Sequence, residues 1–184
     1  MGNPRAGRRS GPYGDGMTTL QGERVTLRPA GPEDVDGLAA IRATPEVRVR
    51  WQGDDLVAEI KDDLADPDLE LLAIEHEGRV VGAIQWHEET DAMYRHAGMD
   101  LYLDPVVHGR GLGSDAVRTL SRHLIHELGH HRLVIDPAAD NTAAIACYAK
   151  VGFQPVGVMR RYELGPDGSW HDGLLMDLLP EDLR

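Results

Sequence analysis

The stretch that most constrains the fold lies near the middle of the chain, where an apolar segment runs into three alternating glycines. Residues 99–103 have the alternation of a strand, and Gly109, Gly111 and Gly113 follow. Without Cβ atoms the backbone can turn tightly and approach a ligand closely. A helix that begins near Gly113 leaves its first N–H groups unpaired at its positive end, where phosphate groups bind. The stretch therefore predicts a strand, a loop for a phosphorylated ligand and a helix.

Two other interpretations of the glycine loop remain open. Residues 111–116 also fit the G-x-G-x-x-A fingerprint of dinucleotide-binding folds, with Asp136 as the acid that binds the ribose. That layout fits the chain poorly, because the fingerprint comes late and too little sequence follows to complete a doubly wound sheet. The second alternative is a glycine-rich connection that binds nothing.

Hydrophobic periodicity places the loop among both strands and helices. Alternating or β-branched segments predict strands at residues 24–28, 71–75, 80–86, 99–103, 132–136, 156–164 and 174–179. Apolar residues at helical spacing, with caps and breakers, predict helices from Pro32 to Thr44, from Asp54 or Asp55 to Asp66, from Gly113 to Gly129, and from Asp140 or Asn141 to Lys150. A polar loop is expected at residues 88–96.

The connections between these strands set the topology. A single helix joins the strand at 99–103 to the strand at 132–136, which predicts a parallel pair. The hairpins predicted at 71–86 and 156–179 are antiparallel. We expect one domain of mixed α+β class over residues 17–184. Residues 1–16, rich in Gly, Pro and Arg, are expected to form a flexible tail.

The net charge of the chain limits the classes of binding partner that we expect. The formal net charge is −12, and the first sixteen residues hold three arginines and one aspartate, so the remainder carries −14. Such a chain repels nucleic acid and anionic membranes and attracts cationic substrates. Solubility is the more common reason for net charge.

Cysteine and histidine positions argue against a disulfide and against a metal site. Cys147 is the only cysteine, and no apolar run is long enough to cross a bilayer, so we expect a cytoplasmic protein. His123, His126 and His130 recur at near-helical spacing, but Gly129 ends the helix before the third of them. No metal is therefore expected.

Two motifs in the right order resemble one family, the GNAT acetyltransferases. The segment His108–Gly113 resembles their pyrophosphate loop, although that loop usually begins with Gln or Arg. The spacing Asn141-x-x-Ala144-x-x-x-Tyr148, followed by Gly152-Phe153, resembles their next motif. The resemblance covers about residues 23–179. It implies a central, mostly antiparallel mixed sheet with one splayed parallel strand pair, flanked by helices, and acetyl-CoA as cofactor.

Within that family the chain looks most like the aminoglycoside 6′-N-acetyltransferases. Four segments carry this resemblance: the aromatic Trp51-Gln52-Gly53, the acidic Glu88-Glu89-Thr90-Asp91, Gly98-Met99-Asp100 and Ile135-Asp136-Pro137. Family members that acetylate peptide N-termini share the glycine loop and the opening pattern at residues 23–28. A peptide or ribosomal-protein N-terminus therefore remains an alternative acceptor.

The resemblance implies a role for each motif residue. Asp100 is the expected general base, Asp136 orients the ammonium group, and Tyr148 protonates the departing thiolate. The expected acetyl-CoA contacts are Leu101, Tyr102, Leu103, His108, Gly109, Arg110, Gly111, Leu112, Gly113, Ser114, Asn141 and Tyr148. The expected acceptor contacts are Trp51, Trp86, Glu88, Glu89, Asp91, Asp100 and Asp136.

Spacing alone allows plainer roles for these residues. A carboxylate at Asp100 can be satisfied by neighbouring N–H groups, and Asp136 can cap the turn at Pro137. Asn141 can cap a helix, and a tyrosine at position 148 fits a core position. The acidic segment at 88–91 can be a solvated surface.

Together these patterns predict an acetyl-CoA-dependent N-acetyltransferase that acts by direct attack of a primary amine, without an acyl-enzyme. The expected acceptor is a small cationic molecule of the aminoglycoside type, which implies antibiotic resistance. A non-catalytic acyl-CoA-binding module on the same fold is the alternative of another class. We expect a monomer or a homodimer, with no nucleic-acid or membrane partner.

Overall fold

A single mixed sheet organises the computed structural model, which describes residues 18–184. The tail predicted at residues 1–16 lies outside the described residues. The eight strands are β1 Leu20–Gln21, β2 Thr26–Pro29, β3 Leu69–His76, β4 Arg79–Glu89, β5 His96–Leu103, β6 Leu133–Ile135, β7 Gln154–Leu164 and β8 Trp170–Leu178. The α-helices are α1 Val35–Arg42, α2 Pro45–Arg48, α3 Leu56–Ala65, α4 Leu112–His126 and α5 Thr142–Val151. Short 3₁₀ turns are η1 Pro32–Asp34, η2 Pro105–Val107 and η3 Pro180–Asp182.

The strand order confirms the expected fold class. It is β1-β2-β3-β4-β5-β6-β8-β7, and β5–β6 is the one parallel pair in the described part of the chain. The doubly wound parallel sheet that a dinucleotide fingerprint requires is not formed by these strands. The sheet is therefore the mostly antiparallel one that the hairpins and the single crossover helix predict.

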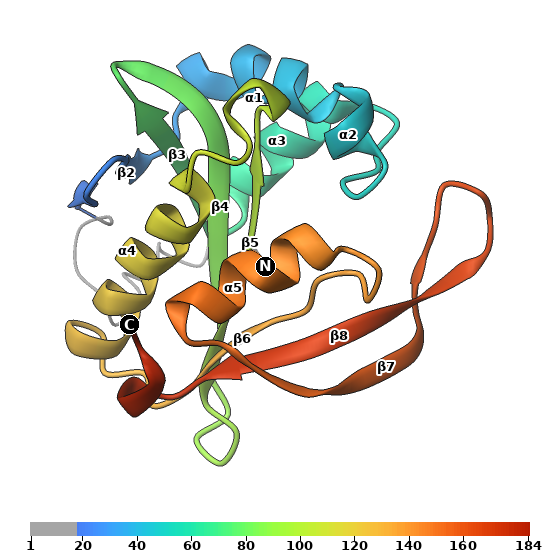
Figure 1. Ribbon diagram of the computed structural model, residues 1–184. Coiled ribbons are helices and arrows are strands. Elements are labelled where there is room, and N and C mark those ends of the chain that lie inside the picture. Colours follow the sequence, from blue (N-terminus) through green and yellow to red (C-terminus); the bar gives the residue numbers. More distant parts are fainter. Residues whose placement is uncertain (1–17) are drawn as a thin grey trace, which may run out of the picture.

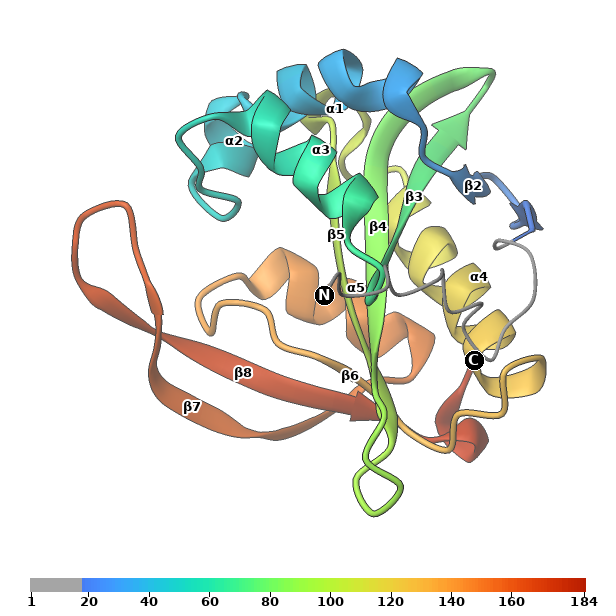
Figure 2. The same ribbon diagram turned by 180° about the vertical axis from the view of Figure 1, so that it is seen from behind.

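Helices cover both faces of the sheet. In Figure 1, α4 and α5 lie in front of the strands, and the reverse view of Figure 2 brings α1 and α3 to the front. The larger core joins one face to α4 through Ala116, Leu120 and Leu124. A smaller core joins the opposite face to α1 and α3, through Leu38 and Ile60 among others.

The parallel pair comes apart almost as soon as it forms. Ala97 pairs with Leu133 and Gly98 with Val134, and no pairing between β5 and β6 continues beyond them. The far half of β5 keeps its partner β4 on one side, down to the pair of Gly82 and Leu103. Among residues 18–184 no strand lies along its other side, so main-chain groups there can bond another molecule.

The first predicted strand corresponds to β2, which begins later than the sequence pattern indicates. Residues 24–28 alternate as a strand does, but the ladder starts only at Thr26. The reason is a competing acceptor, because the Asp115 carboxylate takes the N–H groups of Arg24, at 2.8 Å, and Val25, at 3.0 Å. This contact ties the first turn of α4 to the edge of the sheet.

The expected polar loop at 88–96 is also shorter than predicted. Strand β4 runs on through Glu89, which pairs with His96 at the start of β5. Within residues 18–184, no helix combines the length and the apolar character that crossing a lipid bilayer requires.

Candidate active site

A cavity of about 460 Å³ opens where β5 and β6 separate, a size typical of small-molecule sites. The end of β5, the glycine loop, α5 and the α2 region surround it. Its lining includes the predicted residues Trp51, Leu101, Tyr102, Leu103, His108, Gly109, Gly111, Leu112, Gly113, Ser114, Asn141 and Tyr148. Arg110 is the one predicted cofactor contact outside this lining, and its carbonyl accepts a hydrogen bond from Arg24 at 2.9 Å.

The glycine loop has the backbone shape that its glycines predict. Gly109 and Gly111 adopt left-handed conformations, with φ values of 74° and 81°. Gly111 is also the N-cap of α4, and the first bond of that helix is Asp115 N–H to Gly111 O, at 3.1 Å. The N–H groups of residues 112–114 come before that bond, so they meet the cavity at the positive end of the helix.

His108 stands where the family loop usually has Gln or Arg, and its side chain braces the loop. A ring nitrogen of His108 lies 3.0 Å from the carbonyl oxygen of Leu103. This bond joins the start of the loop to the end of β5.

The predicted capping role of Asn141 is present. Its side-chain oxygen accepts a hydrogen bond from the N–H of Ala144 at 3.2 Å, while the residue also lines the cavity. Further along α5, Cys147 Sγ lies 3.2 Å from Ser114 Oγ, so the two helices meet beside the loop. Burial raises the pKa of the Cys147 thiol.

Strand alternation puts the Asp100 side chain on the face of β5 opposite to Leu101 and Leu103. Leu101 and Leu103 pack with the α4 core, whereas Tyr102 packs with the α1–α3 core. Asp100 is two residues before Tyr102 on the same strand, so both side chains lie on the face that carries α1 and α3. Burial, followed by the nearby charges of Asp136 and Glu163, raises the pKa of Asp100 to about 7.

Tyr148 lies close to both the cavity and the carboxylates of Asp100 and Asp136. Its ring is buried and lies in the cavity lining. Burial is the main cause that raises the pKa of Tyr148 far above its usual value, and the charges of Asp100 and Asp136 add to it. The structure thus brings the three predicted catalytic residues within electrostatic reach of one another.

Trp51 forms an aromatic wall of the cavity. Its ring meets the Tyr102 ring edge-on, with 4.9 Å between centroids. The buried Arg42 guanidinium lies 5.5 Å from the Trp51 ring centroid and donates to Gln52 O at 3.0 Å. These contacts hold the segment after α2 in place.

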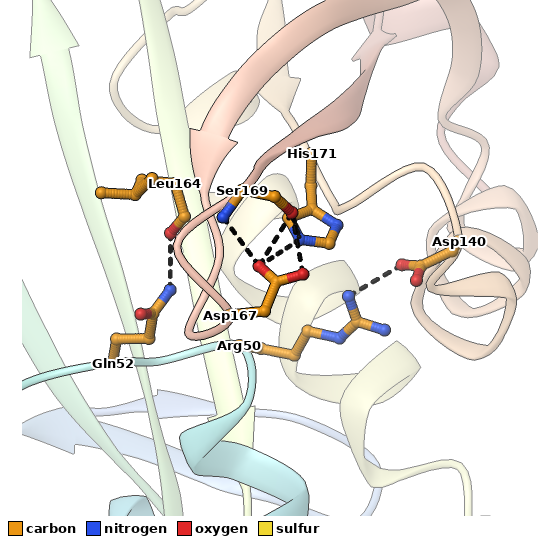
Figure 3. Close-up of polar contacts among 7 residues, drawn as sticks. All are labelled: Arg50, Gln52, Asp140, Leu164, Asp167, Ser169 and His171. Carbon is orange, nitrogen blue, oxygen red and sulfur yellow. Dashed lines mark hydrogen bonds and ion pairs between the residues drawn. The ribbon is translucent and has the colours of Figure 1, made fainter.

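An ion pair and a hydrogen bond connect this segment to neighbouring parts of the chain, as Figure 3 shows. Arg50, which lines the cavity, pairs with Asp140 just before α5, at 2.7 Å. The Gln52 side chain donates to Leu164 O at the end of β7, at 2.7 Å. The segment after α2 is therefore held against two segments that are remote from it in the sequence.

The structure corrects the predicted acceptor contacts at Trp86, Glu88, Glu89 and Asp91, none of which lines the cavity. Asp100 and Asp136 do not line it either, but both lie within electrostatic reach of Tyr148, which does. The Trp86 ring is buried in the core against His130, and Glu88 pairs with Arg95 at 2.7 Å. The hairpin that carries the three acidic residues projects from the far end of β4 and β5 (Figure 1). At about 3.3 Å per residue, the length of β5 separates it from the glycine loop by roughly 25 Å.

Tyr162 and Glu163 on β7 also lie near the carboxylates of Asp100 and Asp136, although the sequence patterns did not predict them. Hydrogen bonding to Asp136 is the main cause that raises the pKa of Tyr162 to about 12. Glu163 is one of the charges that raise the pKa of Asp100. No local motif marks either residue, since both reach the site through an irregularity in strand pairing.

Comparison with known proteins agrees with this geometry. Residues 24–154 match the family model described as Acetyltransferase (GNAT) domain. Mycothiol acetyltransferase of Pseudarthrobacter chlorophenolicus is 31% identical over 140 residues, which are 71% of this chain and 43% of that protein. Aminoglycoside N(6′)-acetyltransferase type 1 of Klebsiella pneumoniae is 37% identical over 84 residues, 45% of this chain and 39% of that protein. The chain spans less than half the length of these curated relatives.

A solved structure extends the likeness to nearly the whole chain. Mycobacterium smegmatis RimJ, in complex with CoA-disulfide, aligns with a TM-score of 0.78 and 23% identity. The alignment covers 91% of this chain and 90% of that one. At this level of identity the likeness concerns the fold.

Proposed function

Because the chain belongs to the GNAT acetyltransferase family, we propose that it transfers an acetyl group from acetyl-CoA to a primary amine by direct attack. The observation that carries the proposal is the continuity of the cavity. It extends from the N–H groups that open α4 to the Tyr148 side chain, with Asp100 and Asp136 within electrostatic reach of Tyr148.

The residues around the cavity fit coenzyme A in two respects. Gly109 and Gly111 hold left-handed conformations that direct main-chain N–H groups at one place, as diphosphate binding requires. The open edge of β5 at residues 101–103, where the Leu103 carbonyl already contacts the His108 ring, can bond an extended amide chain as an added strand would. The pantetheine arm is such a chain, and it would bring the thioester toward Tyr148.

Asp100 is the proposed general base. An amine is mostly protonated at neutral pH and must lose a proton before it can attack the thioester carbonyl. A carboxyl group with a pKa of about 7 is substantially ionised at neutral pH and still basic enough to accept that proton. Asp136 would hold and orient the ammonium group beside it.

Tyr148 is the proposed general acid. A phenol whose pKa is raised by burial keeps its proton until a strong base forms next to it. The thiolate that leaves the acetyl group is such a base. Tyr148 lines the cavity, which is the position that protonation of this leaving group requires.

We propose a polyamine of the aminoglycoside type as the acceptor. Asp100, Asp136 and Glu163 gather negative charge at the site, which favours a substrate with several ammonium groups. The Trp51 ring offers a flat apolar surface for a sugar. A peptide N-terminus carries one ammonium group and would use this charge less fully.

An acceptor screen tests the proposal. Coenzyme A release would be followed with kanamycin, spermidine and a short peptide with a free N-terminus. Turnover with kanamycin above the other two supports the proposed acceptor, and turnover with the peptide alone replaces it. Binding of acetyl-CoA without release for any amine would indicate the non-catalytic acyl-CoA-binding module.

A further inference from the structure

Strand β7 contains an irregular stretch close to the carboxylates of Asp100 and Asp136. Met159 pairs with Gly173 and Glu163 pairs with His171, so residues 160–162 of β7 face Asp172 alone on β8. Arg161 in this stretch has a φ of 53°, which is uncommon for a residue with a long side chain. Bulges of this kind bend a strand and redirect its side chains, and they are frequent beside active sites.

Two contacts with β8 hold the bulge in its shape. The Asp172 carboxylate accepts the N–H of Arg161 at 2.8 Å. The Tyr162 ring lies against the backbone of Gly173, where an added Cβ would come within 2.9 Å of a ring carbon. Glycine at position 173 therefore gives the Tyr162 ring the space that it occupies.

A third contact holds the end of the same segment. Leu164 O accepts the Gln52 side chain at 2.7 Å, next to the aromatic wall formed by Trp51 (Figure 3). The segment from Arg161 to Leu164 is thus fixed at one end by β8 and at the other by the loop after α2.

The redirected side chains face the acceptor carboxylates. The Tyr162 ring lies against Gly173, which bridges to Ala138 two residues after Asp136. Glu163 lies within electrostatic reach of Asp100. Tyr162 is half exposed, at 51%, so its ring remains accessible to a bound molecule.

We propose that Tyr162 determines acceptor specificity, by donating its hydroxyl to the Asp136 carboxylate and by adding an aromatic surface beside it. The inference rests on the proposed function and names a part of its acceptor site. In this proposal one Asp136 oxygen accepts the Tyr162 hydroxyl, and the other oxygen accepts an ammonium N–H of the acceptor. Asp172 and Gly173 act as positioning residues, because they set the bulge that presents Tyr162.

The first test compares Tyr162→Phe with the unaltered protein, using kanamycin and spermidine as acceptors. Loss of the hydroxyl should raise KM for the amine roughly tenfold, as expected for one hydrogen bond to a charged group. KM for acetyl-CoA should stay unchanged. Tyr94→Phe, in the exposed hairpin between β4 and β5, is the matched control.

The second test addresses the bulge. Asp172→Ala removes the acceptor of the Arg161 N–H and should raise the amine KM as Tyr162→Phe does, whereas Asp172→Asn keeps an acceptor oxygen and should restore it. Gly173→Ala should act on the same parameter, since the added methyl group displaces the Tyr162 ring. Thermal melting of each variant separates this effect from a loss of folding.

The outcomes distinguish this inference from the proposed function. An active protein whose Tyr162→Phe variant keeps the amine KM for both acceptors overturns the role of Tyr162 alone. A variant that loses acetyl-CoA affinity instead also contradicts it. If neither amine is acetylated or bound, the proposed acceptor fails and this inference fails with it.

Discussion

Asp100 lies on β5 and Asp136 directly follows β6, two strands that pair at only two positions, and the two carboxyl groups are within electrostatic reach of each other. Burial is the first cause that raises the pKa of Asp100 to about 7, and the Asp136 charge is the next. Two carboxylates held close together resist full ionisation and attract a cation. The separation of β5 from β6 therefore creates both the opening and a carboxyl group suited to proton transfer at neutral pH.

Replacing Asp100 with Asn should lower kcat/KM for the amine by roughly 10²–10⁴-fold, the usual contribution of a general base. In the unaltered protein, kcat/KM should rise with pH through about 7, because only the ionised carboxylate accepts a proton. Steady-state kinetics across this range would measure both effects. The exposed Asp36→Asn in α1 is the control, and an unaltered profile in the Asp100 variant would remove the base assignment.

The Asp100→Asn variant should be more stable than the unaltered protein at alkaline pH. Folding raises the pKa of Asp100 from 3.8 to about 7, so the folded state binds the proton more tightly than the unfolded chain. This group therefore costs stability progressively as the pH rises between these two values. Melting temperatures should diverge in favour of Asp100→Asn up to about pH 7. A less stable variant at pH 8 would mean that damaged folding explains its inactivity.

Cys147 offers a direct probe of where coenzyme A binds. The thiol lies in the cavity wall beside Ser114, and burial raises its pKa, so a thiol reagent should label it slowly. Saturating coenzyme A should slow labelling further, by roughly tenfold or more, since it would cover the cavity wall. Mass spectrometry can follow the reaction at this only cysteine of the chain. Equal rates with and without coenzyme A would contradict binding in the cavity.

Gly111→Ala should weaken acetyl-CoA binding and the fold together. Gly111 has a φ of 81°, and a side chain in the left-handed region costs about 1–2 kcal/mol. Relief of that strain would move the amides at the start of α4, so KM for acetyl-CoA should rise. Gly37→Ala in α1 is the matched control, because an added Cβ there meets nothing within 4 Å and a helical alanine should stabilise by about 0.5–1 kcal/mol. Unchanged KM in Gly111→Ala would exclude the loop as the diphosphate site.

His130 should make the fold sensitive to mild acid. The ring is 1% exposed beside Trp86, and neither ring nitrogen has a hydrogen-bond partner among the described residues. Burial, with Arg95 as the next cause, lowers the pKa of His130 below 6.5, so the unfolded chain binds more protons there. Stability should therefore fall as the pH drops below about 6.5. His130→Leu should flatten this part of the melting curve, and an equally steep decline in that variant would refute the assignment.

The local structure of the proposed cofactor side of the site could be predicted from short-range patterns in the sequence. Gly111 is required because the entry into α4 needs a left-handed residue, and the spacing of Ala116, Leu120 and Leu124 marks the buried side of that helix. Such demands act within a few residues, so a sequence motif can express them. Asn141, as the cap of α5, belongs to the same class.

The acceptor side depended on strand pairing, and here the sequence misled. The acidic residues at 88–91 resembled a substrate loop, but β4 continues through Glu89, and Glu88 pairs with Arg95 across the hairpin. Trp86 has the alternation of a residue inside a strand, and that places its ring in the core. Charge and aromatic content alone did not reveal at which end of β5 these residues would lie.

By itself, then, the sequence determined the class of fold and the shape of the glycine loop proposed to bind a diphosphate, because backbone conformation and helical periodicity are local properties. Only the tertiary structure decided the pKa of Asp100 and the presence of Tyr162 beside Asp136. Both depend on how far apart the strands separate and on where β7 takes up its extra residues. Burial and the distance between charges are set by the packing of segments remote in the sequence, and no stretch of residues contains that information alone.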